Sequence, residues 1–513
     1  MHAGATRRWL WLLASVAALA GCAVGPNYRA PHTAPPENFA AAAPALQAPG
    51  AVSATPPVDL AQWWRALNDP ELDSLIARAI RANPDIEMAL TRLQEARTQL
   101  AAVTSDILPQ VGAGGGAAHG TGSDLARGRA PQTLVSGENT TRLNQVQQIV
   151  GFDAGWELDL FGKYRREIEA AKYDAQAAVW ARNAVLISVV ADVARSYVDL
   201  RGLQMRFAIT RQDVASAEQF RDLVQTRYDR GLTNELDLTL ANRELATLQA
   251  DVAPLLAQIK AVQYSIAVLL GQYPEGLVTE LDKPGLIPSL PQEVQPGLPL
   301  DLLKRRPDVQ EAERQLAAAT ARIGVATADL FPRVALTAGV GAESAHIGNV
   351  PGDHIWSAGP SVYWPLLDFG SLDALVGVAD LQTHERLVSY QRTVFDAVRD
   401  ADTAISNFAA EQERLQYLDA AVLASERAVS VASQRYDRGL TDFLNVVDAE
   451  RQEYALENEY AAMQQSAADA FVSLYRALGG GWEQYQNVPA IRRPLPAVLA
   501  IFRRLATSED PQK

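Results

Sequence analysis

The chain has 513 residues, and its 60 acidic residues outnumber its 46 basic ones, which gives a formal net charge of −14. Phosphate binding needs a cationic surface, so this balance argues against nucleic acid as a partner. With 48% hydrophobic and 21% charged residues, the chain is neither disordered nor a bundle of apolar membrane helices. Its single cysteine excludes an intrachain disulfide and a cysteine-based zinc site.

The N-terminus has the pattern of an export signal. Two arginines precede the apolar run Trp9 to Ala20, which is too short to span a hydrocarbon core of ~30 Å. The run ends at Leu19-Ala20-Gly21-Cys22, which resembles the lipobox of bacterial lipoproteins, in which the cysteine thiol receives a diacylglycerol. We therefore expect a signal peptide over residues 1–21 and a covalent lipid on Cys22, at the start of an acylated N-terminal segment, 22–69. By resemblance to lipoprotein sorting, the non-acidic residues after Cys22 favour the outer membrane.

The mature chain is an internal duplication. The segment Arg-Tyr-Asp-Arg-Gly-Leu-Thr occurs at 227–233 and again at 435–441, an offset of 208 residues. Upstream, Pro84-Asp85 matches Pro307-Asp308 at an offset of 223, so one insertion separates the two registers. The sequence therefore predicts two structural repeats, 70–298 and 299–488, followed by a C-terminal tail, 489–513.

Each repeat contains a predicted strand pair, at 109–160 and at 332–368. From Val150 to Leu160 apolar residues alternate with small or acidic ones, a pattern typical of transmembrane β-barrels and also of a half-buried hairpin in a soluble protein. If the strands form a barrel, the acids Asp153, Glu157 and Asp159 face its lumen and favour cations. Four strands cannot close a barrel, and exposed strand edges are not tolerated in lipid. Several chains must then share one barrel, and three chains would supply twelve strands.

Very long helices follow the strand pairs, at 163–230 and at 371–438. No proline occurs in 132–253 or 366–488, and apolar residues recur at every seventh position of the second helix from Leu387. This heptad stripe indicates coiled-coil packing, and 68 residues of helix span roughly 100 Å. We expect Gly231 and Gly439 to end the long helices. Return helices are predicted at 235–270 and 443–478, and shorter helices at 70–107 and 299–330, the first of them interrupted at Asn83-Pro84.

Several motifs resemble the lipoprotein branch of the TolC-like outer-membrane efflux factors (OprM-like). They are the lipobox cysteine with Gly-Pro-Asn-Tyr at 25–28, Trp63-Trp64, Asn-Asp-Pro at 68–70, Arg-Arg-Pro-Asp at 305–308, and Tyr436 to Gly439 with Asp448-Ala449. The resemblance covers nearly all of the mature chain. It implies a mainly α fold with a small transmembrane β part, in which a homotrimer forms a 12-stranded β-barrel continued by an α-helical tunnel.

The resemblance also implies a function and a gate. Members of this family are outer-membrane exit ducts of Gram-negative bacteria that extend into the periplasm and pass drugs or other toxic small molecules to the exterior. Their partners are a periplasmic adaptor protein and an inner-membrane RND-type transporter. Carried over to this chain, the residues that close the periplasmic tip are Leu444 and Asp448, and a hydrogen-bonded lock between neighbouring helices involves Tyr436 and Arg451.

Two other functions remain open at this point, the channel of a type I protein secretion system and a lipid-anchored coiled-coil scaffold without conductance. An enzyme is not expected. The Asp-Phe-Gly triplet at 368–370 has no nucleotide loop with it, and the six histidines lack metal-binding spacing. We accordingly expect no cofactor apart from the covalent lipid on Cys22.

Overall fold

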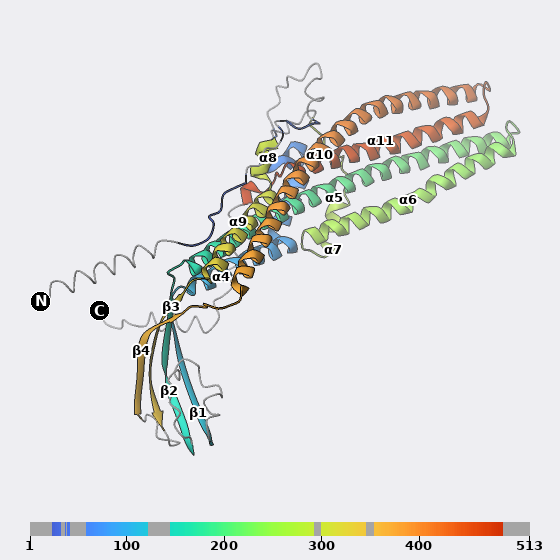
Figure 1. Ribbon diagram of the computed structural model, residues 1–513. Coiled ribbons are helices and arrows are strands. Elements are labelled where there is room, and N and C mark those ends of the chain that lie inside the picture. The colour runs from blue at the N-terminus through green and yellow to red at the C-terminus, as the bar shows by residue number, and fades with distance from the viewer. Residues whose placement is uncertain are drawn as a thin grey trace, which may run out of the picture. The chain divides into compact units, whose positions relative to one another are not determined.

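The computed structural model describes residues 23–31, 36, 38–41, 58–121, 144–291, 299–344 and 353–485. The predicted signal peptide, Cys22 and the C-terminal tail lie outside the described residues. The same order of elements occurs twice: short helices, two strands, a very long helix and a return helix (Figure 1). This confirms the duplicated, mainly α fold class that the repeat offsets predict.

Four pairs of corresponding elements have equal lengths in the two copies: α4 and α9, β1 and β3, α5 and α10, and α6 and α11. In the first copy they are η1 (Leu60–Leu67), α3 (Pro70–Ala82), α4 (Pro84–Ser105), β1 (Gln110–Thr121), β2 (Asn144–Leu158), α5 (Lys163–Asp229), α6 (Glu235–Leu269) and α7 (Glu275–Leu281). In the second copy they are α8 (Pro299–Arg305), α9 (Pro307–Ala328), β3 (Arg333–Ser344), β4 (Asp353–Tyr363), α10 (Ser371–Asp437), α11 (Phe443–Ala477) and η3 (Glu483–Tyr485).

The four strands form one antiparallel sheet in the order β1-β2-β3-β4. The central pairing joins β2 of the first copy to β3 of the second, where Gly151 lies opposite Gly341. A Cβ atom on Gly151 would lie 2.6 Å from the carbonyl oxygen of Val340, so glycine permits this close approach of the two strands. β1 and β4 are left as the edges of the sheet.

The long helices α5 and α10 have 67 residues each, and the return helices α6 and α11 have 35 each. These bounds lie within one residue of the predicted ones. The helix α6 continues through Pro254, although proline lacks the N–H for one helical hydrogen bond and usually costs ~3 kcal/mol in a helix interior.

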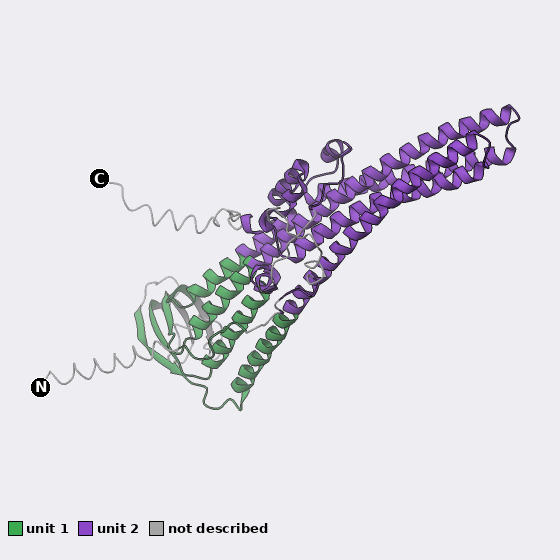
Figure 2. Ribbon diagram, turned by 90° about the horizontal axis from the view of Figure 1, so that it is seen from above, with its two compact units in different colours: residues 1–33, 95–179, 311–392 green, residues 34–94, 180–310, 393–513 purple. Residues whose placement is uncertain are grey.

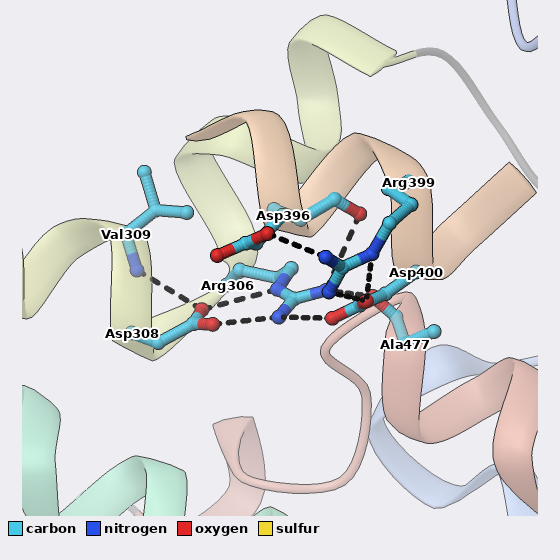
Figure 3. A network of polar contacts seen from close by, with 8 residues as sticks. Arg306, Asp308, Val309, Asp396, Arg399, Asp400 and Ala477 are labelled. Carbon is cyan, nitrogen blue, oxygen red and sulfur yellow. Dashed lines mark hydrogen bonds and ion pairs between the residues drawn. The ribbon is translucent and has the colours of Figure 1, made fainter. Parts of the chain in front are cut away.

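The prediction of one continuous helix over 299–330 is wrong in one respect. The structure has two helices there, α8 and α9, separated at Arg306. Pro307 disfavours helical geometry at the preceding residue and begins the next helix. The Arg306 guanidinium then joins three helices (Figure 3). It donates to both carboxylate oxygens of Asp308, to the carbonyls of Ala397 and Ala477, and to Asp400 at 3.5 Å.

The chain divides into two compact units, and both repeats contribute to each of them (Figure 2). Unit 1 contains residues 1–33, 95–179 and 311–392, and unit 2 contains residues 34–94, 180–310 and 393–513. Unit 1 therefore holds the sheet, and unit 2 holds the hairpins that α6 and α11 make with the C-terminal parts of α5 and α10. The repeat boundaries at 70–298 and 299–488 stay a prediction, because these units are not divided by repeat.

Candidate functional site

The tip of unit 2 is formed by the two copies of Arg-Tyr-Asp-Arg-Gly-Leu-Thr, which turn each long helix into its return helix. Gly231 and Gly439 have φ values of +71° and +69°, in the left-handed region. In the first copy the N–H of Gly231 donates to the carbonyl of Tyr228, and the N–H of Leu232 to that of Arg227, both at 2.8 Å. The second copy repeats this pattern. Each turn is therefore a Schellman motif, in which glycine is needed for its backbone conformation.

An aromatic cluster holds the two hairpins together beside these turns. Phe220 of α5 stacks on Phe443 of α11 at a centroid distance of 5.4 Å, and Tyr436 of α10 lies within 6.3 Å of both rings. The Arg227 guanidinium lies over the Tyr436 ring, 4.5 Å from its centroid. The same guanidinium is 3.2 Å from the carboxylate of Asp437. Arg227 of the first copy thus binds two consecutive residues of the second copy.

The two residues predicted to close the tip are both exposed in the single chain. Leu444 is 61% exposed, and Asp448 lies one helical turn further along the same face of α11. Between them, Val446 and Val447 are buried in the aromatic cluster. Leu444 and Asp448 are therefore on the side of α11 that does not pack within the chain, where they are available to another surface.

The two residues predicted to form the lock have different partners within the chain. Tyr436 is 7% exposed, and its hydroxyl has no hydrogen-bond partner in the described part of the chain. Arg451 lies 3.5 Å from Glu244 of α6. The contacts around Tyr436 are those of the aromatic cluster, so the lock between Tyr436 and Arg451 stays a prediction. Sequence reasoning missed both actual partners, Arg227 and Glu244, because no local pattern shows which residue of the other hairpin faces them.

The two copies differ at the position of Asp448. Its counterpart in the first copy, Leu240, packs against the aromatic cluster instead of being an exposed acid. Only the second copy therefore presents a carboxylate at this point of the tip, and the assignment of the gate to Leu444 and Asp448 stays a prediction.

The sheet in unit 1 has one apolar face and one face of small and polar residues. Directly opposed residues share a face, and across the sheet Phe152, Val340 and Trp356 form one row, all of them at least 56% exposed. The neighbouring row on the other face reads Gly112, Asp153, Gly339 and Ser357. A sheet with an exposed apolar face and a polar reverse is what a barrel in lipid requires, and a soluble hairpin would bury the apolar face instead.

The three strand acids do not have the same role. Asp153 is on the polar face, and Glu157, on the same face, accepts a hydrogen bond from the Tyr164 hydroxyl at 3.2 Å. Asp159 differs from the prediction, because its side chain is only 7% exposed. It accepts from the backbone N–H groups of Tyr164 and Arg165 and from the Arg165 guanidinium. Asp159 is therefore a cap of α5 and not a free acid of the lumen.

In the second copy, α10 is capped by Asp368, which lies one residue after the position equivalent to Asp159. Asp368 accepts from the backbone N–H groups of Gly370 and Leu372, at 3.2 Å and 2.7 Å. These backbone hydrogen bonds, that of Leu372 above all, hold the pKa of Asp368 below its usual range. The Asp-Phe-Gly triplet thus has a structural role as a helix start.

The residues after Cys22 are held against the junction between strands and helices. The buried Arg166 guanidinium donates to the carbonyls of Val24 and Gly25 and to the Asn27 side chain, at 2.9–3.1 Å. The N–H of Val24 donates to the carbonyl of Phe161. A Cβ atom on Gly25 would lie 2.4 Å from the Cα atom of Gly324, so this position requires glycine. We call residues 23–28 the N-terminal strap.

Within the described residues, no group of three or more His, Cys, Asp or Glu side chains is arranged to hold a metal ion.

The family model of outer membrane efflux proteins matches residues 75–272 and 298–480, which is most of the chain. The chain belongs to the outer membrane efflux protein family. The antibiotic efflux pump outer membrane protein ArpC of Pseudomonas putida is 31% identical over 93% of this chain and 96% of its own length. The outer membrane protein OprJ of Pseudomonas aeruginosa is 29% identical over 92% of this chain and 95% of its own length.

Solved structures of the family agree with the fold. The outer-membrane channel OprN superposes with a TM-score of 0.78 at 35% identity, covering 90% of this chain and all of that one. The open state of the MtrE outer membrane channel of Neisseria gonorrhoeae gives a TM-score of 0.73 at 27% identity, covering 91% of this chain and all of that one. This membership confirms the expected outer-membrane location and efflux function.

Proposed function

We propose that three copies of this chain form an exit duct, in which their sheets close into one barrel of twelve strands. The observation that carries this proposal is the sheet with two unpaired edges, β1 and β4, and an exposed apolar face. Unpaired backbone groups cost several kcal/mol each in lipid, so these edges must pair with strands of neighbouring copies.

A covalent lipid on Cys22 would anchor each copy beside its own barrel strands. Ala23, the next residue, packs against Gly162, where a Cβ atom would lie 2.6 Å from the Ala23 Cα atom. Gly162 directly precedes α5 and lies four residues after the end of β2. The acyl chains would therefore enter the membrane at the end of the strands nearest the helices.

At the tip of unit 2, Leu444 and Asp448 from three copies would form a ring that narrows the duct. Three carboxylates around one axis repel each other, so the closed ring needs cations, and Arg451 lies three residues further along the same helix. A periplasmic adaptor would bind the helical tip, and an inner-membrane RND-type transporter would supply the energy. Relatives named as antibiotic, toluene and cation efflux proteins support small toxic compounds as the cargo.

The deciding experiment reconstitutes the purified full-length protein in planar lipid bilayers. A duct is expected to give single-channel currents, together with a trimer that resists dissociation by detergent until it is heated. A lipid-anchored scaffold would give no current and no heat-resistant oligomer, and that result would overturn the proposal.

A further inference from the structure

Acidic side chains from four helices converge in unit 2, behind the tip; Asp213, Glu244 and Glu450 are buried, and Glu426 is exposed. Three of them lie on α11 at helical spacing, and one comes from each of the other helices; they are Glu450, Glu453, Glu457, Asp213 of α5, Glu244 of α6 and Glu426 of α10. Buried carboxylates are normally paired with a cation or with hydrogen-bond donors. Three buried acids inside one coiled coil therefore require an explanation.

Asp213 is the most isolated member of this acid cluster. Asp213 is 3% exposed, and its Oδ2 atom has no hydrogen-bond partner in the described part of the chain. Burial, followed by the charges of Glu457 and Glu453, raises the pKa of Asp213 to about 7. An unpartnered carboxyl in this environment is most stable when it carries a proton.

Glu450 has the same character on α11. It is 9% exposed, and burial, followed by the charges of Glu453 and Glu244, raises its pKa to about 7. The pKa values of Glu453 and Glu457 are also raised, by burial and by their acidic neighbours. The buried Tyr454 ring lies among these groups, and its pKa is raised by burial and by Glu450, Asp213, Glu453 and Glu244.

The acid cluster is connected to the proposed gate through Glu244. The cations facing Glu244 are Arg451, at 3.5 Å, and Arg243, at 3.9 Å. Glu450 lies two residues after Asp448 and directly before Arg451. A change in charge at Glu450 or Asp213 therefore acts on the helix and on the ion pair that hold the gate residues.

We propose that Asp213 and Glu450 form a proton-binding site inside the coiled coil, with Glu244 as the residue that positions Arg451. With protons bound, α11 packs closely against α5 and α6 and the tip is closed. Without them, repulsion among the acids separates α11 from α5 and α6 and weakens closure. This inference rests on the proposed function of the tip as a gate.

The sign of the effect follows from the direction of the pKa shifts. The closed packing raises both pKa values above those of acids in water, so closure is favoured most at low pH. The advantage is lost progressively between about pH 4 and about pH 7, and it changes little above that. The open probability of the duct is expected to rise about tenfold or more from about pH 5 to about pH 7, since each proton released contributes up to tenfold per pH unit.

The test compares the full-length protein with the double variant D213N/E450Q, in which both acids are replaced by neutral groups of similar size. The control is D251N/E413Q, at two exposed acids of α6 and α10. Two measurements are made on each protein across this pH range: the open probability in planar bilayers and the thermal unfolding of the helices in detergent.

The expected result is that D213N/E450Q loses most of the pH dependence in both measurements, while the control keeps it. If the thermal unfolding of the double variant depended on pH as strongly as that of the natural chain, the proposed proton-binding site would be wrong, whatever the currents show. If no protein gives currents at any pH, the proposed duct fails, and the unfolding curves still decide whether the site binds protons. If unfolding responds as expected but open probability does not, the coupling to the gate is wrong.

Discussion

The guanidinium of Arg227 lies over the ring of Tyr436, and the two residues come from the two copies of the same seven-residue segment. The Tyr228 ring of the first copy, by contrast, is 38% exposed. If three duplicated chains surround one axis, each contact between repeats within a chain has an equivalent contact between chains. We therefore expect Arg435 of one copy to cover Tyr228 of the next copy.

Replacing Arg227 with glutamine should loosen the tip. The substitution removes a cation–π contact, worth about 0.5–2 kcal/mol, and the ion pair with Asp437. We expect the open probability in bilayers to rise about two- to thirtyfold, because 1.4 kcal/mol corresponds to a factor of ten. The control is Arg438→Gln, at an exposed arginine in the turn of the second copy. An equal response of both variants would show that charge at the tip matters and the ring contact does not.

Replacing Asp448 with alanine should raise the resting conductance. The exposed carboxylates of three copies are proposed to hold the closed ring through cationic partners, and alanine removes them and widens the bore. Single-channel recording of a correctly assembled trimer measures this effect. Asp442→Ala, at an exposed acid just before α11, is the matched control. Unchanged resting conductance of Asp448→Ala would refute the assignment of this residue to the gate.

The strand acids should separate into selectivity and stability effects. Asp153→Asn and Glu157→Gln are expected to reduce cation preference, seen as a smaller reversal potential in a salt gradient. Asp159→Ala should leave the reversal potential nearly unchanged and lower the free energy of unfolding by about 1–2 kcal/mol, because it removes the cap of α5. If Asp159→Ala changed selectivity as much as Asp153→Asn, its role as a buried cap would be wrong.

Replacing Gly25 with alanine should release the N-terminal strap. The new methyl group would overlap the backbone of Gly324, and the φ of +85° at Gly25 adds strain. We expect faster proteolysis after Arg29 and a trimer that dissociates at a lower temperature. Arg166→Met, which removes the donors to Val24 and Gly25, should have the same effect. Gly276→Ala, where a Cβ atom meets nothing within 4 Å, should change neither property.

The sequence by itself determined the elements of this protein and their order. Alternation with a period of two predicted the strands around Trp156, a proline-free heptad pattern predicted α10, and the repeated segment with Gly439 predicted the end of that helix. The alternation, the heptad spacing and the glycine at the helix end are local signals, because each depends on residues a few positions apart in the chain. The resemblance to the family then located Leu444 and Asp448 on one face of α11.

Only the tertiary structure decided which side chains are satisfied and which are free. Asp159 and Asp153 are equivalent in the strand pattern, yet one caps a helix and the other faces the polar side of the sheet. The partners of Tyr436 and Arg451, and the burial of Asp213 among other acids, depend on residues far apart in the chain. The free energy of a charge is set by the solvent and the groups around it, and those exist only once the helices have packed.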